Sequence, residues 1–238
     1  MKKVFVFAVL FVLMIAAAAV CAAPEISDQI NLIAANANLW KQNIDFGLWG
    51  FAVTDLDHNG RLEILAASVQ GTGFYTYINA YEVNEKGDGF NELQGPSILR
   101  TDSAPDIMVS NVPCYFDKDA GRYYYIFDDY IRNGIAENYQ NRCAVSIADG
   151  KWEETTLASK ATIYTDADHY TMTCTDASGN TITEEEYDEI AQTVYGKLKA
   201  GEICLNWQMT EKGDFEALSS AQLIEKLNTA ADGTCKAN

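Results

Sequence analysis

The fold is decided by the stretch from residue 112 to residue 127, which reads Val112-Pro113-Cys114-Tyr115-Phe116-Asp117-Lys118-Asp119-Ala120-Gly121-Arg122-Tyr123-Tyr124-Tyr125-Ile126-Phe127. Its two ends are rich in aromatic and β-branched residues, which are typical of strands. Between them, Lys118-Asp119-Ala120-Gly121 has the composition of a tight turn. The stretch therefore predicts an antiparallel β-hairpin.

Similar strand signals extend from about residue 46 to residue 174, and helical patterns flank them on both sides. Ser27 is a suitable N-cap for a first helix whose apolar stripe continues to Trp40. Thr183 and Glu186 form a capping box for a helix to Leu198, with Gly201 as its C-terminal cap. A strand is expected at 203–207, and Ser219 with Gln222 starts a last helix.

The predicted fold class is α+β, an antiparallel β-sheet meander with an N-terminal helix and C-terminal helices. The chain has 238 residues, of which 48% are apolar, enough for a sizeable core. It contains no long linker and no clear internal repeat. We therefore expect one α+β domain over residues 23–238.

The first 22 residues are predicted to be a signal peptide. Lys2 and Lys3 precede an uncharged apolar stretch, and Val20-Cys21-Ala22 supplies small residues for cleavage before Ala23. We expect a secreted, periplasmic or cell-surface protein that has no membrane segment after cleavage. Lipidation at Cys21, which would make the chain a lipoprotein, is a minor alternative.

The net charge limits the possible partners, and the cysteine count limits the possible disulfides. The formal net charge is −17, which repels nucleic-acid phosphates and anionic lipid and favours cations. Cleavage at residue 22 leaves five cysteines, so at most two intramolecular disulfides can form and one thiol remains. The spacings contain no zinc or thioredoxin-like motif.

One loop has the spacing of a calcium site. Asp55, Asp57, Asn59 and Glu63 place oxygen side chains at relative positions 1, 3, 5 and 9, and Arg61 can offer its main-chain carbonyl at position 7. Gly60 permits the sharp turn, and His58, at the intervening position, is expected to point to solvent. Ca²⁺ suits this oxygen set better than Mg²⁺ does. The flanks 49–53 and 62–65 read as strands, so the loop should close a hairpin.

The segment from Phe46-Gly47 through Asp55-Leu56-Asp57-His58-Asn59-Gly60-Arg61-Leu62-Glu63 to Ala66-Ala67-Ser68 resembles a single FG-GAP or VCBS-type repeat. Such repeats occur in integrin α-subunit propellers and many bacterial surface proteins. The resemblance implies a calcium hairpin at 46–68 with the ligands named above. Other segments, such as Ile182-Thr183-Glu184-Glu185-Glu186-Tyr187, resemble uncharacterised secreted proteins of anaerobic bacteria, which implies a location only.

These observations favour an exported bacterial protein with a structural calcium hairpin, a binding or structural module more than an enzyme. No G-x-S-x-G elbow occurs, and the two histidines leave little material for a catalytic triad. The partners expected are calcium and an extracellular protein or glycan. The alternative is a carbohydrate-active protein, either a glycan binder or a paired-carboxylate hydrolase. Alternation separates Tyr123 and Tyr125 from Tyr124, so aromatics exposed on this strand could stack on sugars, although cross-strand packing is the simpler interpretation.

Overall fold

The computed structural model describes residues 23–41, 49–70, 75–93, 106–148, 150–166 and 169–232. The predicted signal peptide, Cys21 and Cys235 lie outside these residues, as does the Phe46-Gly47 start of the predicted repeat. The α+β class with an antiparallel meander is confirmed, and the strands are divided between two sheets. Among the described residues, no helix is both long and apolar enough to cross a membrane.

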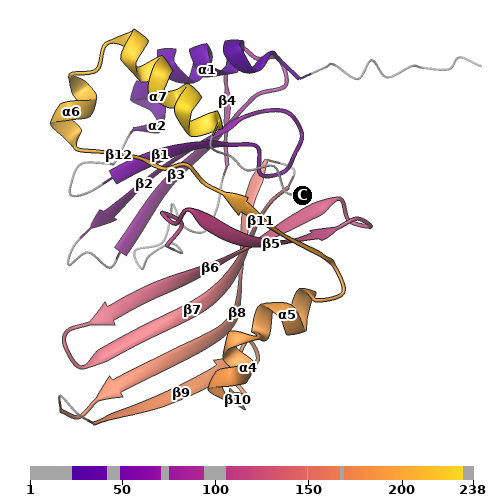
Figure 1. The fold of residues 1–238 in the computed structure, drawn as a ribbon, viewed down its shortest axis with the longest axis vertical. Coiled ribbons are helices and arrows are strands. Elements are labelled where there is room, and N and C mark those ends of the chain that lie inside the picture. Colours follow the sequence, from indigo (N-terminus) through magenta and orange to yellow (C-terminus); the bar gives the residue numbers. More distant parts are fainter. Residues whose placement is uncertain are drawn as a thin grey trace, which may run out of the picture.

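The first sheet, called sheet A, has five strands and carries helices on one face (Figure 1). Its order is β12 (Gln208–Thr210), β1 (Trp49–Thr54), β2 (Glu63–Gln70), β3 (Tyr75–Val83) and β4 (Phe90–Glu92). The covering helices are α1 (Ile26–Ala35), α2 (Ala37–Trp40), α6 (Lys212–Glu216) and α7 (Ser220–Asp232). Trp40, Phe51 and Phe215 pack together at the centre of this helix-sheet layer.

The second sheet, called sheet B, has seven strands, and the three at its centre are 12 to 14 residues long. Its order is β10 (Thr181–Ile182), β9 (Tyr170–Asp176), β8 (Lys151–Tyr164), β7 (Glu137–Ala148), β6 (Arg122–Asn133), β5 (Asn111–Asp117) and β11 (Lys199–Cys204). The short helices α4 (Glu184–Asp188) and α5 (Ile190–Tyr195) lie on one face of it. The hairpin expected at 112–127 is confirmed as β5 and β6.

The two sheets share a buried core. Leu65 and Ile78 of sheet A pack with Tyr125, Phe127 and other side chains of sheet B. Since alternate residues of a strand point to opposite faces, Ile64 and Ala66 of β2 point instead toward the helices. Sheet A is therefore buried on both faces, which explains why all six residues of β1 are buried.

The aromatic residues at the start of β6 pack against other rings or in the core. Tyr125 is fully buried between the sheets, while Tyr124 stacks on Tyr195 of α5 with ring centroids 4.6 Å apart. Tyr123 stacks on Phe116 at 4.5 Å. These contacts favour the cross-strand interpretation over sugar stacking at these positions.

Several helix boundaries differ from the sequence predictions. The first helix begins at Ile26 with Glu25 as its N-cap, so the prediction of Ser27 as the cap is wrong. The capping box of Thr183 and Glu186 is confirmed. However, the helical segment ends at Tyr195 with Gly196 as its cap, and Gly201 lies within β11. Residues 199–204 form β11 because they pair with β5, which is distant in the sequence. A local helical pattern cannot predict such a pairing.

The start of the last helix agrees with the sequence prediction, and the buried cysteines act in packing. Gln222 donates its main-chain N–H to the hydroxyl of Ser219 at the start of α7, as predicted. Cys114, Cys143 and Cys174 are free thiols and all three are buried, whereas Cys204 is half-buried. At the three buried positions, cysteine acts as a small apolar residue.

Candidate metal centre

The centre is built on the hairpin of β1 and β2. The two strands pair antiparallel from Trp49–Ser68 to Thr54–Glu63, so the predicted loop begins directly after the last pair. His58 has a φ of 57° and Gly60 a φ of 83°, both in the left-handed region. The main-chain N–H of Gly60 donates to Asp55 Oδ2 at 3.1 Å, and that of Asn59 donates to Asp57 Oδ1 at 3.2 Å. These bonds curl the loop so that its carboxylates converge.

Three of the predicted ligands come together. Asp55, Asp57 and Glu63 each offer a carboxylate oxygen within 4.8 Å of the others. Asp55 and Asp57 are half-buried, and Glu63 is 0% exposed. Three like charges at this distance repel one another strongly away from water, so the arrangement calls for a cation or a proton.

Glu63 is held by only one of its two oxygens. Its Oε2 accepts hydrogen bonds from the Thr54 hydroxyl and the Leu56 main-chain N–H, both at 2.8 Å. Its Oε1 is buried and has no hydrogen-bond partner among the described residues. Asp55 Oδ1 is buried and unpartnered in the same way. A buried carboxylate oxygen without a partner costs about 1 to 3 kcal/mol, which a bound cation would offset.

A fourth acid, Glu82 of β3, was not predicted. It lies directly opposite Glu63 across the β2–β3 ladder and is 1% exposed. Like charges opposite each other in a sheet are destabilising. Glu82 Oε1 forms an ion pair of 2.8 Å with Arg61, whereas its Oε2 is buried and unpartnered among the described residues. The sequence could have indicated that Glu82 is buried, because residues 78, 80 and 82 of a strand share one face and Ile78 and Ala80 are buried there.

The electrostatics agree with this geometry. Burial raises the pKa of Glu63 well above its usual range, and the charge of Asp57 adds to that effect. Burial, then the neighbouring Glu82 carboxylate, raises the pKa of Asp57 to about 6. The pKa of Asp55 is also raised, chiefly by burial. Each shift shows that the carboxylates lack enough positive charge around them.

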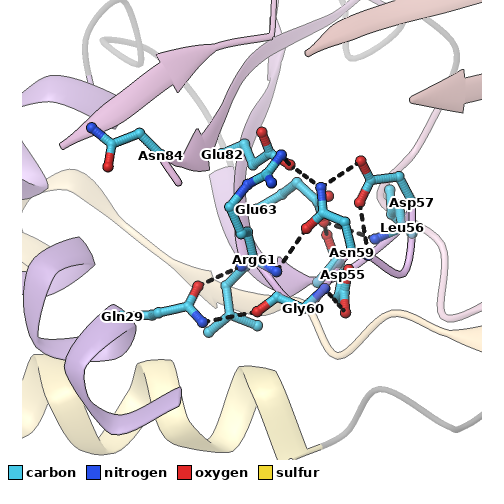
Figure 2. Close-up of polar contacts among 12 residues, drawn as sticks. Gln29, Asp55, Leu56, Asp57, Asn59, Gly60, Arg61, Glu63, Glu82 and Asn84 are labelled. Atoms are coloured by element: carbon cyan, nitrogen blue, oxygen red, sulfur yellow. Dashed lines mark hydrogen bonds and ion pairs between the residues drawn. The ribbon is translucent and has the colours of Figure 1, made fainter. Parts of the chain in front are cut away.

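The remaining loop residues occupy different roles in this conformation. Figure 2 shows Asn59 between Asp57 and Glu82, and its amide nitrogen donates to both carboxylates. The Asn59 oxygen accepts from the Arg61 main-chain N–H at 2.7 Å. The Arg61 side chain turns to Glu82, while the ligand predicted from this residue is its main-chain carbonyl. Asn59 and Arg61 thus partly balance the acids.

His58 was expected to point to solvent, and the residue is exposed. Its ring also lies against Tyr123 of β6, with centroids 4.1 Å apart, a contact that was not predicted. Beside it, the Tyr125 hydroxyl donates to the Leu56 carbonyl at 2.6 Å. The aromatic strand of sheet B therefore supports the loop of sheet A.

Helix α1 holds the other side of the loop through a second residue that was not predicted. The buried Gln29 side chain donates to the Gly60 carbonyl at 2.9 Å and accepts from the Leu62 main-chain N–H at 2.7 Å (Figure 2). It also donates to the Pro24 carbonyl at 2.7 Å. The loop is therefore fixed by a helix on one side and by sheet B on the other.

Comparisons of the chain with protein-family models, with curated proteins and with solved structures found no match. The resemblance to an FG-GAP or VCBS-type repeat therefore stays a prediction, and the chemistry of the site rests on its own geometry.

Proposed function

We propose that this chain is an exported binding or structural protein that holds a structural Ca²⁺ at the turn between β1 and β2. The observation that carries the proposal is the set of buried oxygens on Asp55, Glu63 and Glu82 that have no hydrogen-bond partner in the described part of the chain. Asp55 and Glu63 cluster with Asp57, and Glu82 lies opposite Glu63 in the sheet. A proton could neutralise one of these acids, but one cation could neutralise several at once.

The choice of Ca²⁺ follows from the donors. All of them are oxygens, and they come from the loop and from Glu63 at the start of β2. Ca²⁺ accepts 6 to 8 oxygens in a flexible shell, whereas Mg²⁺ demands near-ideal octahedral geometry and retains its waters. A half-turn of the Asn59 amide would exchange its nitrogen for its oxygen and add the fourth predicted side-chain ligand.

The role proposed for the ion is to stabilise the fold. The loop carries Leu56 into the core between the sheets, and Tyr125 of sheet B donates to the Leu56 carbonyl. Cancelling the repulsion among the acids would hold the loop in this position and so stabilise the contact between the sheets. A structural ion of this kind is compatible with the proposed export, because extracellular calcium modules bind with Kd values of about 10⁻⁴ to 10⁻³ M.

Calorimetric titration of the metal-free protein with CaCl₂ and MgCl₂ tests the proposal. We expect one calcium site per chain, weaker binding of magnesium, and loss of calcium binding in Asp55→Asn. Asp119→Asn, which alters an exposed acid in the β5–β6 turn, is the matched control and should bind normally. Equal calcium binding by native protein and Asp55→Asn would reject the site.

A further inference from the structure

A second candidate site lies on sheet B, far along the chain from the metal centre. It is a groove of about 530 Å³ on strands β6 to β9, bordered by Glu184 of α4. We call it the tyrosine groove, and the lining residues that matter here are Tyr130, Asn138, Gln140, Thr162, Tyr164 and Tyr170.

The groove exists because the helices cover only part of this sheet face. Residues paired directly across an antiparallel ladder share a face, and Tyr130 pairs with Gln140, as Asn138 does with Thr162. Toward one end of the strands, the same face carries α4 and α5 over Ala158 of β8 and Cys174 of β9. Figure 1 shows these two helices beside one end of the long strands, while the strands continue beyond them.

Aromatic rings are unusually exposed at this place. Tyr170, the first residue of β9, is 59% exposed, and Tyr130 of β6 is 47% exposed. The rings of Tyr164 and Tyr170 form a tilted pair with centroids 5.6 Å apart. At the opposite side, the Gln140 amide nitrogen donates to the Tyr130 hydroxyl at 3.0 Å and fixes the position of that group.

Between these aromatic walls the floor is polar. Asn138, Gln140 and Thr162 provide amide and hydroxyl groups. Lys160 is engaged locally, since its ammonium lies 4.7 Å from the Tyr187 ring centroid and 3.4 Å from a Glu184 oxygen. Arg132 also lines the groove, and its Nε donates to the Gly134 carbonyl at 3.1 Å. The groove therefore combines flat apolar surfaces and neutral hydrogen-bonding groups with two cationic side chains, Lys160 and Arg132, that are engaged locally.

This combination selects among ligand classes. The chain's net charge of −17 opposes nucleic acids and anionic lipids. Strands β7 and β8 are hydrogen-bonded on both sides, so a peptide cannot reach their main-chain groups from above the floor. A sugar ring has an apolar face that stacks on an aromatic side chain and hydroxyl groups that bond to amides. From β6 to β9 the groove crosses three strand spacings, about 14 Å, which suits an oligosaccharide.

We propose that the tyrosine groove binds a neutral oligosaccharide, whose rings stack on Tyr130 and Tyr170 and whose hydroxyls hydrogen-bond to Asn138 and Gln140. The tyrosine groove is a different surface from the Tyr123 segment, for which sugar stacking was considered on the basis of the sequence. The site is independent of the metal centre, so either assignment can fail without the other.

The test uses the full purified protein in calcium-containing buffer and a panel of defined probes: neutral hexasaccharides of glucose, xylose and mannose, with oligogalacturonate as the acidic comparison. Calorimetry or affinity electrophoresis should detect at least one neutral probe. Tyr130→Ala and Tyr170→Ala should each weaken that binding about tenfold. Tyr77→Ala, at an exposed tyrosine of sheet A, is the matched control and should bind normally.

Three results would overturn the proposal: no neutral probe binds, only oligogalacturonate binds, or binding survives in the Tyr130→Ala, Tyr170→Ala double variant. Thermal unfolding of each variant separates loss of binding from loss of folding, and the exposed positions of both rings predict native-like melting. Asp57→Asn should retain sugar binding, which separates a failure of this site from a failure of the calcium site.

Discussion

Replacing Glu63 by glutamine separates the charge of the metal centre from its shape. In the native chain, Glu63 Oε2 accepts from Thr54 and from Leu56, and Oε1 has no partner among the described residues. A glutamine oxygen can accept both hydrogen bonds, and its amide nitrogen would replace Oε1 and donate to a neighbouring carboxylate. The substitution keeps the network and removes an ionisable group whose charged form is disfavoured by burial.

The expected effect of the substitution on stability depends on whether calcium is present. Without calcium, Glu63→Gln removes a like-charge pair with Glu82, worth about 0.2 to 1 kcal/mol, and a buried unpartnered oxygen, worth about 1 to 3 kcal/mol. After allowing for the overlap of these two effects, we expect the free energy of unfolding to rise by about 1 to 2 kcal/mol. That corresponds to an increase in Tm of about 2 to 8 °C for a chain of this size.

Calcium should raise the free energy of unfolding of the native protein but not that of the Glu63→Gln variant. At about 2 mM Ca²⁺ and a Kd of about 10⁻⁴ to 10⁻³ M, mass action stabilises the native protein by about 0.6 to 1.8 kcal/mol. Loss of a central ligand should abolish this gain in Glu63→Gln. The difference in stability between the two proteins should therefore shrink or reverse when calcium is added.

Thermal unfolding followed by circular dichroism, on chelator-treated protein with and without CaCl₂, measures both effects. Glu92→Gln, at an exposed position of β4 in the same sheet, is the matched control and should leave both Tm values unchanged. The reasoning is refuted if metal-free Glu63→Gln melts below the native protein, or if calcium raises the Tm of both proteins equally.

Three further predictions concern neighbouring features. Gln29→Ala removes the hydrogen bonds that tie the loop to α1, so urea denaturation should show a loss of about 1 to 3 kcal/mol, and calorimetry should show weaker calcium binding; unchanged values would contradict the role of Gln29. Because the pKa of Asp57 is about 6 in the folded protein and its usual value is 3.8, the folded state binds the proton more tightly; the metal-free protein should gain stability from this group as the pH falls from 7 through 6, and the gain should be absent in Asp57→Asn. Burial raises the pKa of the Cys143 thiol to about 12, so mass spectrometry after alkylation at pH 8 should show much slower labelling of Cys143 in the folded protein than in the urea-unfolded protein; equal rates would argue against the buried thiol.

Local signals in the sequence predicted local structure well. The hairpin at 112–127 and the capping box of Thr183 and Glu186 depend on residues close together in the chain, and both are confirmed. The strands that flank the acidic loop are confirmed as β1 and β2 for the same reason. Asp55, Asp57 and Glu63 converge because the spacing of the loop itself brings them together.

Features that depend on distant partners were not predicted. Glu82 joins the site only through the register of β3 against β2, and Gln29 joins it only because α1 packs over the hairpin. The division into two sheets has the same cause, since alternation defines the two faces of a strand but not its neighbours. The contact of His58 with Tyr123 was missed because Tyr123 comes from the opposing sheet.

The most direct test of the calcium assignment is anomalous diffraction from a crystal of the protein in about 10 mM CaCl₂, at least ten times the expected Kd. We predict one anomalous peak among Asp55, Asp57 and Glu63, about 2.3 to 2.6 Å from their carboxylate oxygens, with the Asn59 amide oxygen turned toward it. A map without a peak at this position, and with the Asn59 nitrogen still donating to Asp57 and Glu82, would contradict the assignment.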